Sequence, residues 1–179
     1  MLTCYQFKTM NILEHGKSVH DYYLDLIEHL RHGSPLKYEW RLPKWLTDYK
    51  DIILKGVYDL DIMSQYHIYH DCGKPLCVTI DEHGKQHFPN HAEVSYKRWL
   101  EYSNNETIAN LIRSDMDIHL LRSDGAEEFA KRPEAISLLI TGLAEIHSNA
   151  QMFGGIESDS FKIKWKRLDK LGCKILKLK

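Results

Sequence analysis

The chain has 179 residues, of which 27% are charged and 43% are hydrophobic, and its formal net charge is −1. This composition excludes wholesale disorder, and a chain of this length buries about two-thirds of the surface that its unfolded form exposes, so we expect one globular domain over residues 1–179. The longest uncharged apolar run, residues 136–144, is shorter than the roughly 20 residues of a membrane span, and the N-terminus carries no basic-then-apolar leader. We therefore predict a soluble, cytoplasmic protein without membrane contact. Its four cysteines lack paired CxxC spacing and are expected to be free thiols.

The predicted elements in the first half of the chain are helical. Apolar residues recur at helical spacing over residues 11–30, which predicts an amphipathic helix with His15 near its start, and residues 34–46 show no period. Asp48 is expected to cap a second helix that carries Ile53, Val57, Leu60 and His67 on one stripe and ends at Gly73 and Pro75. This helix would present His70 and Asp71 at its C-terminal end.

The second half is predicted to begin with a β-hairpin and to continue as helices. Residues 77–88 form two β-type runs around an Asp-Glu-His-Gly turn, and helices are expected over residues 91–102 and from a cap at Asn104 or Asn105. The capped helix is expected to carry Ile108, Leu111, Ile112, Asp115 and His119 along one side. A further helix should begin at Pro133 and be stopped by residues 154–155. The expected fold is an all-α bundle with a small inserted hairpin near residues 77–88.

Charge is distributed unevenly along the chain. Residues 162–179 hold eight Lys or Arg against one Asp, a net charge of +7, whereas residues 1–161 carry −8. Lys162 and Lys164 flank this extension's Trp165, and cations interleaved with an aromatic ring are typical of contact with a phosphate backbone and a stacked base. The alternative is a basic helix or strand docked on an acidic body.

A cluster of His and Asp carries the strongest chemical signal. His67, His70 and Asp71 offer ring nitrogens and carboxylate oxygens within five residues. Adjacent residues on a helix point about 100° apart, so His70 and Asp71 converge on one ion only near a helix end, which Gly73 and Pro75 supply. By itself a His-Asp dipeptide is usually without function.

The surrounding residues resemble a known family. His70-Asp71-Cys72-Gly73-Lys74-Pro75, followed by a charged hairpin and by the run from His87 to Val94, is similar to the HD domain of bacterial CCA-adding tRNA nucleotidyltransferases. Upstream, residues 13–16 resemble the start of the helix with that family's first metal histidine, and residues 111–116 resemble its last ligand segment. The likeness covers roughly residues 11–120, and the whole chain is similar to stand-alone HD proteins of bacteriophages, which implies the cytoplasm of a bacterial host.

The resemblance implies a metal site and roles for nearby residues. Its implied ligands are His15, His70, Asp71 and Asp115. His20 or His29 are alternatives to His15, and Asp117 is the alternative to Asp115, which we prefer because His119 lies four residues further along the same helical face. Lys74, Arg113 and His119 are candidates for catalysis, and substrate contacts are expected from His67, His91, Lys162 and Lys164. For His147 and Asn149 a structural role is favoured.

The implied reaction is metal-dependent phosphoester hydrolysis. Nitrogen and oxygen ligands suit Mn²⁺, Fe²⁺, Co²⁺, Ni²⁺ or Zn²⁺, with Mg²⁺ as a further candidate, and such an ion lowers the pKa of its water from 15.7 towards about 7. The expected substrates are nucleotides or RNA ends, for example a 2′,3′-cyclic phosphate. The alternatives are a nucleotidase acting on free mono- or triphosphates and a non-catalytic HD-like module that binds RNA or protein.

Overall fold

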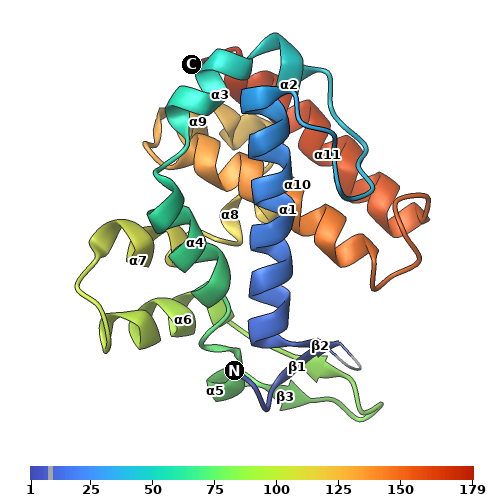
Figure 1. Cartoon of the computed structure of the whole chain (residues 1–179). Coiled ribbons are helices and arrows are strands. Elements are labelled where there is room, and N and C mark those ends of the chain that lie inside the picture. The colour runs from blue at the N-terminus through green and yellow to red at the C-terminus, as the bar shows by residue number, and fades with distance from the viewer. Residues whose placement is uncertain (8–9) are drawn as a thin grey trace. The chain divides into compact units, whose positions relative to one another are not determined.

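A computed structural model describes residues 1–7 and 10–179 and shows a mainly helical chain (Figure 1). The chain divides into two compact units. The first unit comprises Met1–Ser18 and Leu60–Met116, and the second comprises Val19–Asp59 and Asp117–Lys179. The helices and the hairpin at residues 79–87 confirm the expected fold class of an all-α protein with a small β insertion. Whether residues 1–179 fold as one domain stays a prediction.

The first unit contains the residues of the candidate site. Its elements are β1 (Tyr5–Phe7), β2 (Met10–Asn11), the start of α1 (Ile12–His32), α4 (Leu60–Tyr69), α5 (Lys74–Cys77), β3 (Thr79–Ile80), β4 (Gln86–His87), α6 (His91–Leu100) and α7 (Glu106–Arg113). Strands β1 and β2 pair antiparallel, as do β3 and β4. Helix α7 packs against α4 and α6, and the buried side chains Met63, Ile108, Leu111 and Ile112 form the unit's core.

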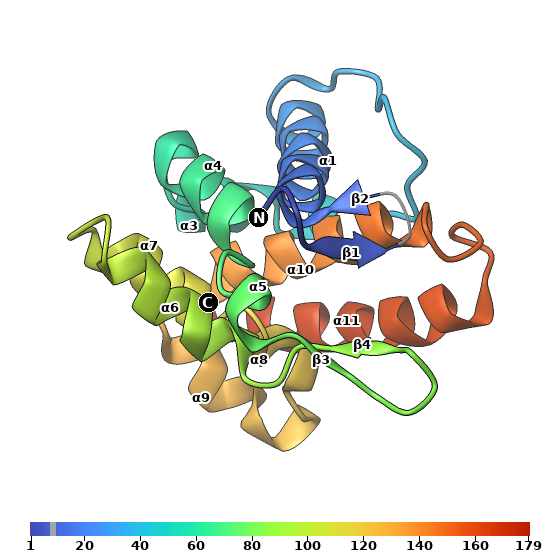
Figure 2. The same ribbon diagram turned by 90° about the horizontal axis from the view of Figure 1, so that it is seen from below.

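The second unit surrounds one largely buried helix. Its elements are the rest of α1, α2 (Trp45–Asp48), α3 (Lys50–Gly56), α8 (Asp117–Leu120), the 3₁₀ helix η1 (Ser123–Gly125), α9 (Ala126–Lys131), α10 (Ala135–Ala150) and α11 (Asp159–Leu176). Helix α10 is apolar nearly all round and packs against α3, α8, α9 and α11, which is the pattern of a core helix. Figure 2 shows α10 and α11 side by side.

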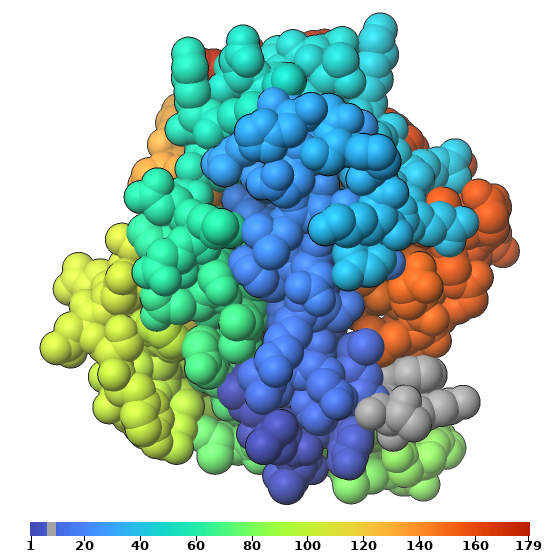
Figure 3. Space-filling view, viewed as in Figure 1, coloured from blue at the N-terminus to red at the C-terminus, as the bar shows by residue number. Residues whose placement is uncertain are grey.

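Three predicted helices keep their place in the sequence. Helix α1 follows the expected amphipathic pattern, with Val19, Leu26 and Ile27 buried and one side at the surface (Figure 3). Helix α6 covers most of the expected range. Asn105 caps α7 by accepting a hydrogen bond from the backbone N–H of Ile108 at 3.1 Å. The four cysteines are free, as expected.

The predicted second helix is wrong as a single element. Helix α3 ends at Gly56 because Val57 is extended, at φ −82° and ψ 144°, and Tyr58 donates its backbone N–H to Ser137 Oγ at 3.0 Å. A separate helix, α4, then begins at Leu60. Asp48 ends α2 and does not cap this region, and Pro75 lies inside α5 rather than beyond a helix end. His70 and Asp71 nevertheless follow directly on the last residue of α4.

The bounds of α7 and α10 differ from those predicted. Helix α7 ends at Arg113, where the backbone turns before α8 begins at Asp117, so Asp115 and His119 do not share one helical face. A helical face shared with His119 therefore gives no preference for Asp115 over Asp117. Pro133 lies in the turn before α10 rather than in its first turn. Gly154 and Gly155 follow α10 with positive φ angles of 90° and 80°, in agreement with the expected stop.

The basic extension is the amphipathic helix α11. Its apolar side chains Phe161, Leu168, Leu171 and Ile175 are buried, and the helix packs against α2, α9 and α10. Lys164, Lys166, Arg167 and Lys170 are exposed. The sequence left a docked basic helix open as an alternative, and α11 is such a helix, packed on other helices of the second unit with a cationic surface exposed.

Candidate metal centre

His15 is placed by the start of α1. The Asn11 side chain accepts from the backbone N–H of Glu14 at 2.9 Å, and the Glu14 carboxylate accepts from the backbone N–H of Asn11 at 2.9 Å. This reciprocal capping box begins the helix so that His15 lies in its first turn. The next residue, Gly16, allows α1 to approach α4 closely, because a Cβ there would lie 2.7 Å from the carbonyl oxygens of both His67 and Ile68.

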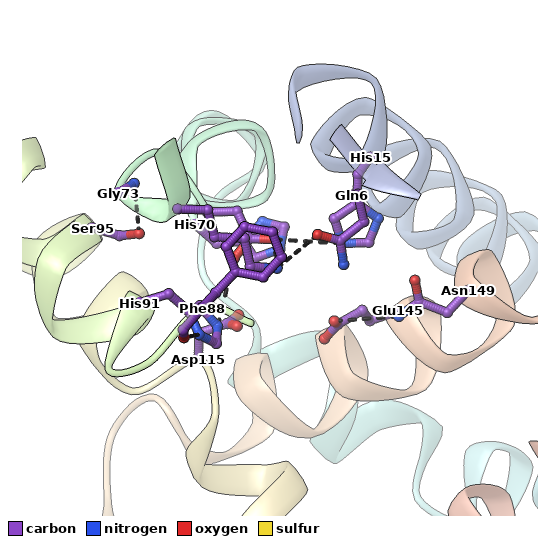
Figure 4. Close-up of polar contacts among 12 residues, drawn as sticks. Gln6, His15, His70, Gly73, Phe88, His91, Ser95, Asp115, Glu145 and Asn149 are labelled. Carbon is purple, nitrogen blue, oxygen red and sulfur yellow. Dashed lines mark hydrogen bonds and ion pairs between the residues drawn. The ribbon is translucent and has the colours of Figure 1, made fainter. Parts of the chain in front are cut away.

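His70 and Asp71 are placed by a tight turn at the end of α4. The His70 backbone N–H still bonds to the Tyr66 carbonyl at 2.8 Å, and the chain then turns through residues 71–73 into α5. Gly73 lies directly on α6: its N–H donates to Ser95 Oγ at 2.9 Å, and a Cβ would lie 2.4 Å from the Ser95 nitrogen (Figure 4). The turn can therefore carry only glycine at this position.

Side chains from two segments distant in the sequence, residue 15 and residues 70–71, meet in the buried interior of the first unit. Asp71 Oδ2 lies 3.2 Å from Nε2 of His70 and 3.8 Å from Nε2 of His15. Ring nitrogens of the two histidines lie within 4.8 Å of each other, and the ring centroids are 5.3 Å apart. The exposed fractions of His15, His70 and Asp71 are 0%, 2% and 1%. Two imidazoles and a carboxylate thus share one small volume.

His70 and His91 are oriented by the same kind of hydrogen bond. In each, Nδ1 donates to a backbone carbonyl three residues earlier, His67 at 2.7 Å for His70 and Phe88 at 3.0 Å for His91. In a neutral ring this leaves the lone pair on Nε2, which faces Asp71 Oδ2 at 3.2 Å from His70 and Oδ1 at 3.6 Å from His91. A carbonyl that fixes the ring and its tautomer is the usual support of a metal-binding histidine.

Asp71 is ionised and is also paired with Lys74. Burial would raise the pKa of the Asp71 carboxyl, but His70 and Lys74, with His15 further off, outweigh burial and hold that pKa well below its ordinary value. Lys74 Nζ donates to Asp71 Oδ2 at 2.5 Å and to Gln6 Oε1 at 2.8 Å. Within residues 1–7 and 10–179, Asp71 Oδ1 accepts no hydrogen bond. One carboxylate oxygen therefore contacts a cation, and the other, also buried, faces His91.

Asp115 belongs to the first unit and is buried there. It lies in the turn after α7 and accepts a hydrogen bond from the Tyr66 hydroxyl at 2.6 Å, while the Tyr66 ring contacts the His70 ring at 6.3 Å between centroids. Asp117, its alternative, is in the second unit, half-buried, and accepts from Arg132 at 2.6 Å. The structure thus places Asp115, rather than Asp117, in the unit that holds the His-Asp cluster.

The other expected site residues fall into two groups. His67 is buried on α4, and Arg113 is exposed, donating to Glu93 at 3.0 Å above the Tyr96 ring. The remaining residues belong to the second unit, and they are His20, His29, His119, His147, Asn149, Lys162 and Lys164.

Among these residues of the second unit, several have defined contacts. His29 Nδ1 donates to the Ser34 carbonyl at 2.8 Å, His119 Nε2 lies 2.7 Å from Glu145, and Lys162 pairs with Glu157 at 2.9 Å. Figure 4 also draws Glu145 and Asn149 of α10, which bond to each other at 3.4 Å.

His147 shows what a structural histidine looks like in this chain. Both of its ring nitrogens are used by backbone groups, since Nδ1 donates to the Leu143 carbonyl at 2.7 Å and Nε2 accepts the Arg41 N–H at 3.0 Å. The ring packs against Trp40 and Phe161, and burial lowers its pKa to about 4. This agrees with the structural role favoured from the sequence and contrasts with His70 and His91, whose Nε2 atoms face a carboxylate.

Sequence reasoning missed four residues that support the cluster: Gln6, Gly16, Tyr66 and Ser95. Tyr66 precedes His70 by one helical turn, so its proximity to His70 was open to prediction from spacing. Gln6 bonds to Lys74, which is 68 positions away, and Ser95 bonds to Gly73, which is 22 positions away. No local sequence pattern predicts such contacts.

Comparison of the chain with protein-family models, with curated proteins and with solved structures gave no match. Among the residues that the structure describes, no helix combines the length and the apolar character that crossing a membrane requires.

Proposed function

We propose that the chain is a metal-dependent phosphohydrolase that acts on nucleotides or RNA ends, such as a 2′,3′-cyclic phosphate. The observation that supports this proposal is the buried cluster in which Nε2 atoms of His15, His70 and His91 face the two oxygens of Asp71. Nitrogen atoms of two or three imidazoles and oxygen atoms of one carboxylate thus converge on a small buried volume. A divalent metal ion fits this donor set of nitrogen and oxygen, and it would take the place of the protons that otherwise lie between these atoms.

The proposed ligands are His15, His70 and Asp71, with Asp115 as a fourth from the same unit. Mixed nitrogen and oxygen donors suit Mn²⁺, Fe²⁺, Co²⁺, Ni²⁺ or Zn²⁺, and Mg²⁺ is a further candidate. When bound, such an ion activates water and polarises a phosphoryl oxygen. The backbone carbonyl of His67 orients His70, and a substrate contact of the His67 ring stays a prediction.

Lys74 and His91 are the proposed phosphate-binding groups of the first unit. Lys74 contacts the same Asp71 oxygen that faces His15 and His70, so a metal ion and the Lys74 ammonium compete for this oxygen. Once displaced, the ammonium can neutralise charge on a phosphate. His91 has the more accessible ring, with 17% of its side chain exposed, and can contact a phosphate oxygen or donate a proton to the leaving oxygen.

A second candidate function is a non-catalytic HD-like module that binds RNA or protein. The observation that favours it is the 2.5 Å ion pair between Lys74 and Asp71, because this pair already compensates the buried carboxylate without a metal ion. In that case the histidines around Asp71 serve only to stabilise the first unit.

Metal content distinguishes the two functions. The wild-type protein is dialysed against Mn²⁺, Co²⁺ or Ni²⁺ and compared by elemental analysis with Asp71→Asn and His70→Ala. The matched control is His83→Ala, which removes an exposed histidine of the hairpin. We expect bound metal in the wild type and the control and its loss in both site variants. Folding of each variant is checked by circular dichroism, and Asp71→Asn preserves the size of the side chain.

Activity is then tested on RNA with a 2′,3′-cyclic end, on mononucleotides and on nucleoside triphosphates. Turnover that needs metal and disappears in Asp71→Asn supports the hydrolase. Turnover of mononucleotides or triphosphates alone indicates a nucleotidase. Equal metal content in wild type and folded site variants contradicts the proposed metal centre and favours the binding module.

A further inference from the structure

A cationic groove lies in the second unit, on the exposed side of α11. The last residue of α8 and the segment after it, residues 120–123, form one wall, and α11 forms the other, enclosing a hollow of about 750 Å³. We call it the α11 groove. Four cations line it: Arg122, Lys166, Arg167 and Lys170.

These four positive charges are uncompensated. Within the part of the chain that the structure describes, none of the four lies within ion-pair distance of a carboxylate, whereas Lys162 on the same helix pairs with Glu157. Arg167 donates to the Leu121 carbonyl at 2.6 Å, which ties the two walls together without neutralising the guanidinium. The lining residues include no Asp or Glu. The groove therefore presents concentrated positive potential, which selects an anionic partner.

The same groove exposes large aliphatic side chains. Leu120 is 67% exposed and Ile163 is 70% exposed, and they line the groove with Leu121 and Leu171. Two aliphatic side chains this exposed, both beside cations, offer apolar surface that a partner could bury. A partner that fits this groove must therefore bring both carboxylates and aliphatic side chains.

The chemistry of the groove does not favour nucleic acid. Single strands are usually held by aromatic side chains on which bases stack, and the groove is lined by no aromatic residue. Trp165, the aromatic residue of the basic extension, is engaged elsewhere: its indole N–H donates to the Arg41 carbonyl at 2.7 Å, and the Arg41 guanidinium lies 4.7 Å from its ring centroid. Aliphatic side chains beside cations match an amphipathic helix with an acidic face better than they match a nucleobase.

We propose that the α11 groove binds an acidic amphipathic helix of a partner protein. From Ile163 to Lys170 the groove follows α11 over seven residue steps, about 10 Å at about 1.5 Å per residue, which corresponds to about two turns of a bound helix. Leucine or isoleucine of the partner would pack between Leu120 and Ile163. Glutamate or aspartate on the flanking positions would pair with Lys166, Lys170 and Arg122. This binding does not depend on the proposed metal centre.

The proposal is tested with a fluorescent peptide of about four helical turns that carries Leu at i, i+4, i+7 and i+11 and Glu at most other positions. The second probe is a scrambled peptide of equal composition, and the third is a single-stranded RNA of equal net charge. Binding is measured by anisotropy with the full chain at two salt concentrations. The groove variants are Lys166→Glu/Lys170→Glu and Ile163→Ser. The matched control, Lys50→Glu/Lys55→Glu, makes the same charge change on exposed residues of α3.

We expect the amphipathic peptide to bind at least tenfold more tightly than the scrambled one. Lys166→Glu/Lys170→Glu should weaken its binding at least tenfold and Ile163→Ser several-fold, while the control changes it less than twofold. Equal binding of the two peptides, or equal loss in the groove and control variants, overturns the proposal, because either shows non-specific charge attraction. RNA that binds more tightly than the peptide, and loses affinity in the groove variants, overturns it in favour of nucleic acid.

Discussion

Gly16 provides a sharp test of how His15 reaches the cluster, because two physical effects predict opposite signs for Gly16→Ala. Helix propensity alone predicts that alanine inside α1 stabilises the protein by about 0.5–1 kcal/mol. Packing predicts the reverse, since the new Cβ would lie 2.7 Å from the carbonyl oxygens of His67 and Ile68, where ordinary contacts begin at 3.4 Å. The backbone of α1 must therefore move away from α4 by about 0.7 Å.

Overpacking of this kind costs about 1–3 kcal/mol, and here the obstructing atoms are backbone, which cannot turn aside as a side chain can. After the propensity gain of about 0.5–1 kcal/mol is subtracted, we expect the free energy of unfolding to fall by up to about 2.5 kcal/mol, a decrease in Tm of up to roughly 10 °C. Urea and thermal unfolding followed by circular dichroism measure both. The control is Lys17→Ala, a neighbouring exposed position where the change should stay within about 0.5 kcal/mol. A Gly16→Ala variant more stable than wild type would refute the close approach of α1 to α4.

Three further changes test other parts of the structure. Lys74→Met removes the cation that competes for Asp71 Oδ2, so we expect tighter binding of Mn²⁺ or Co²⁺ in a calorimetric titration but slower hydrolysis; weaker binding would mean that Lys74 supports the site. Asp25→Ala should lower the free energy of unfolding by about 3 kcal/mol, because buried Asp25 accepts hydrogen bonds from the backbone N–H groups of Lys37 and Tyr38 and from the Trp40 indole. The control is Asp21→Ala on the exposed side of α1, and an equal loss of stability in both variants would contradict the reasoning. Burial lowers the pKa of His147 from 6.5 to about 4, so between these two pH values the unfolded chain binds a proton at His147 and the folded chain does not. The contribution of neutral His147 to the free energy of unfolding is therefore complete above pH 6.5, and it decreases by up to roughly 3 kcal/mol as the pH falls towards 4. Urea unfolding at pH 7 and pH 5 should show this loss of stability, and His147→Gln should reduce it.

Local chemistry explains which elements the sequence predicts. The period of buried residues in α1, the Asn105 cap of α7 and the turn of the β3–β4 hairpin are each complete within a few neighbouring residues. The break between α3 and α4 is different, because it depends on the Tyr58 N–H bonding to Ser137, 79 positions away. Helix α9 was missed because it has only six residues, too few to show a period.

The residues of the candidate site could likewise be predicted from local sequence, whereas the orientation of their side chains could not. His15, His70, Asp71, His91 and Asp115 are found together in the first unit, and each was named from its sequence motif. Their orientation was not open to prediction. The carbonyl that fixes each ring belongs to the same helix or turn, but whether Nε2 then meets a carboxylate depends on how separate elements pack. The expectation that His119 shares a helical face with Asp115 is wrong because α7 ends at Arg113, with Ser114 as its C-cap.

If the cluster around Asp71 holds the proposed metal ion, its charges predict that metal and phosphate bind cooperatively. Lys74 and a divalent ion beside one carboxylate oxygen would repel each other, so the ion would displace the ammonium from Oδ2, where it lies at 2.5 Å. Displacement leaves a desolvated positive charge without its partner, and an arriving phosphate supplies the compensating negative charge. Each ligand thereby lowers the cost of binding the other, and by linkage the coupling must be reciprocal. In the proposed hydrolase Lys74 would thus have two roles: it compensates the buried carboxylate before the metal binds, and it would contact the substrate afterwards.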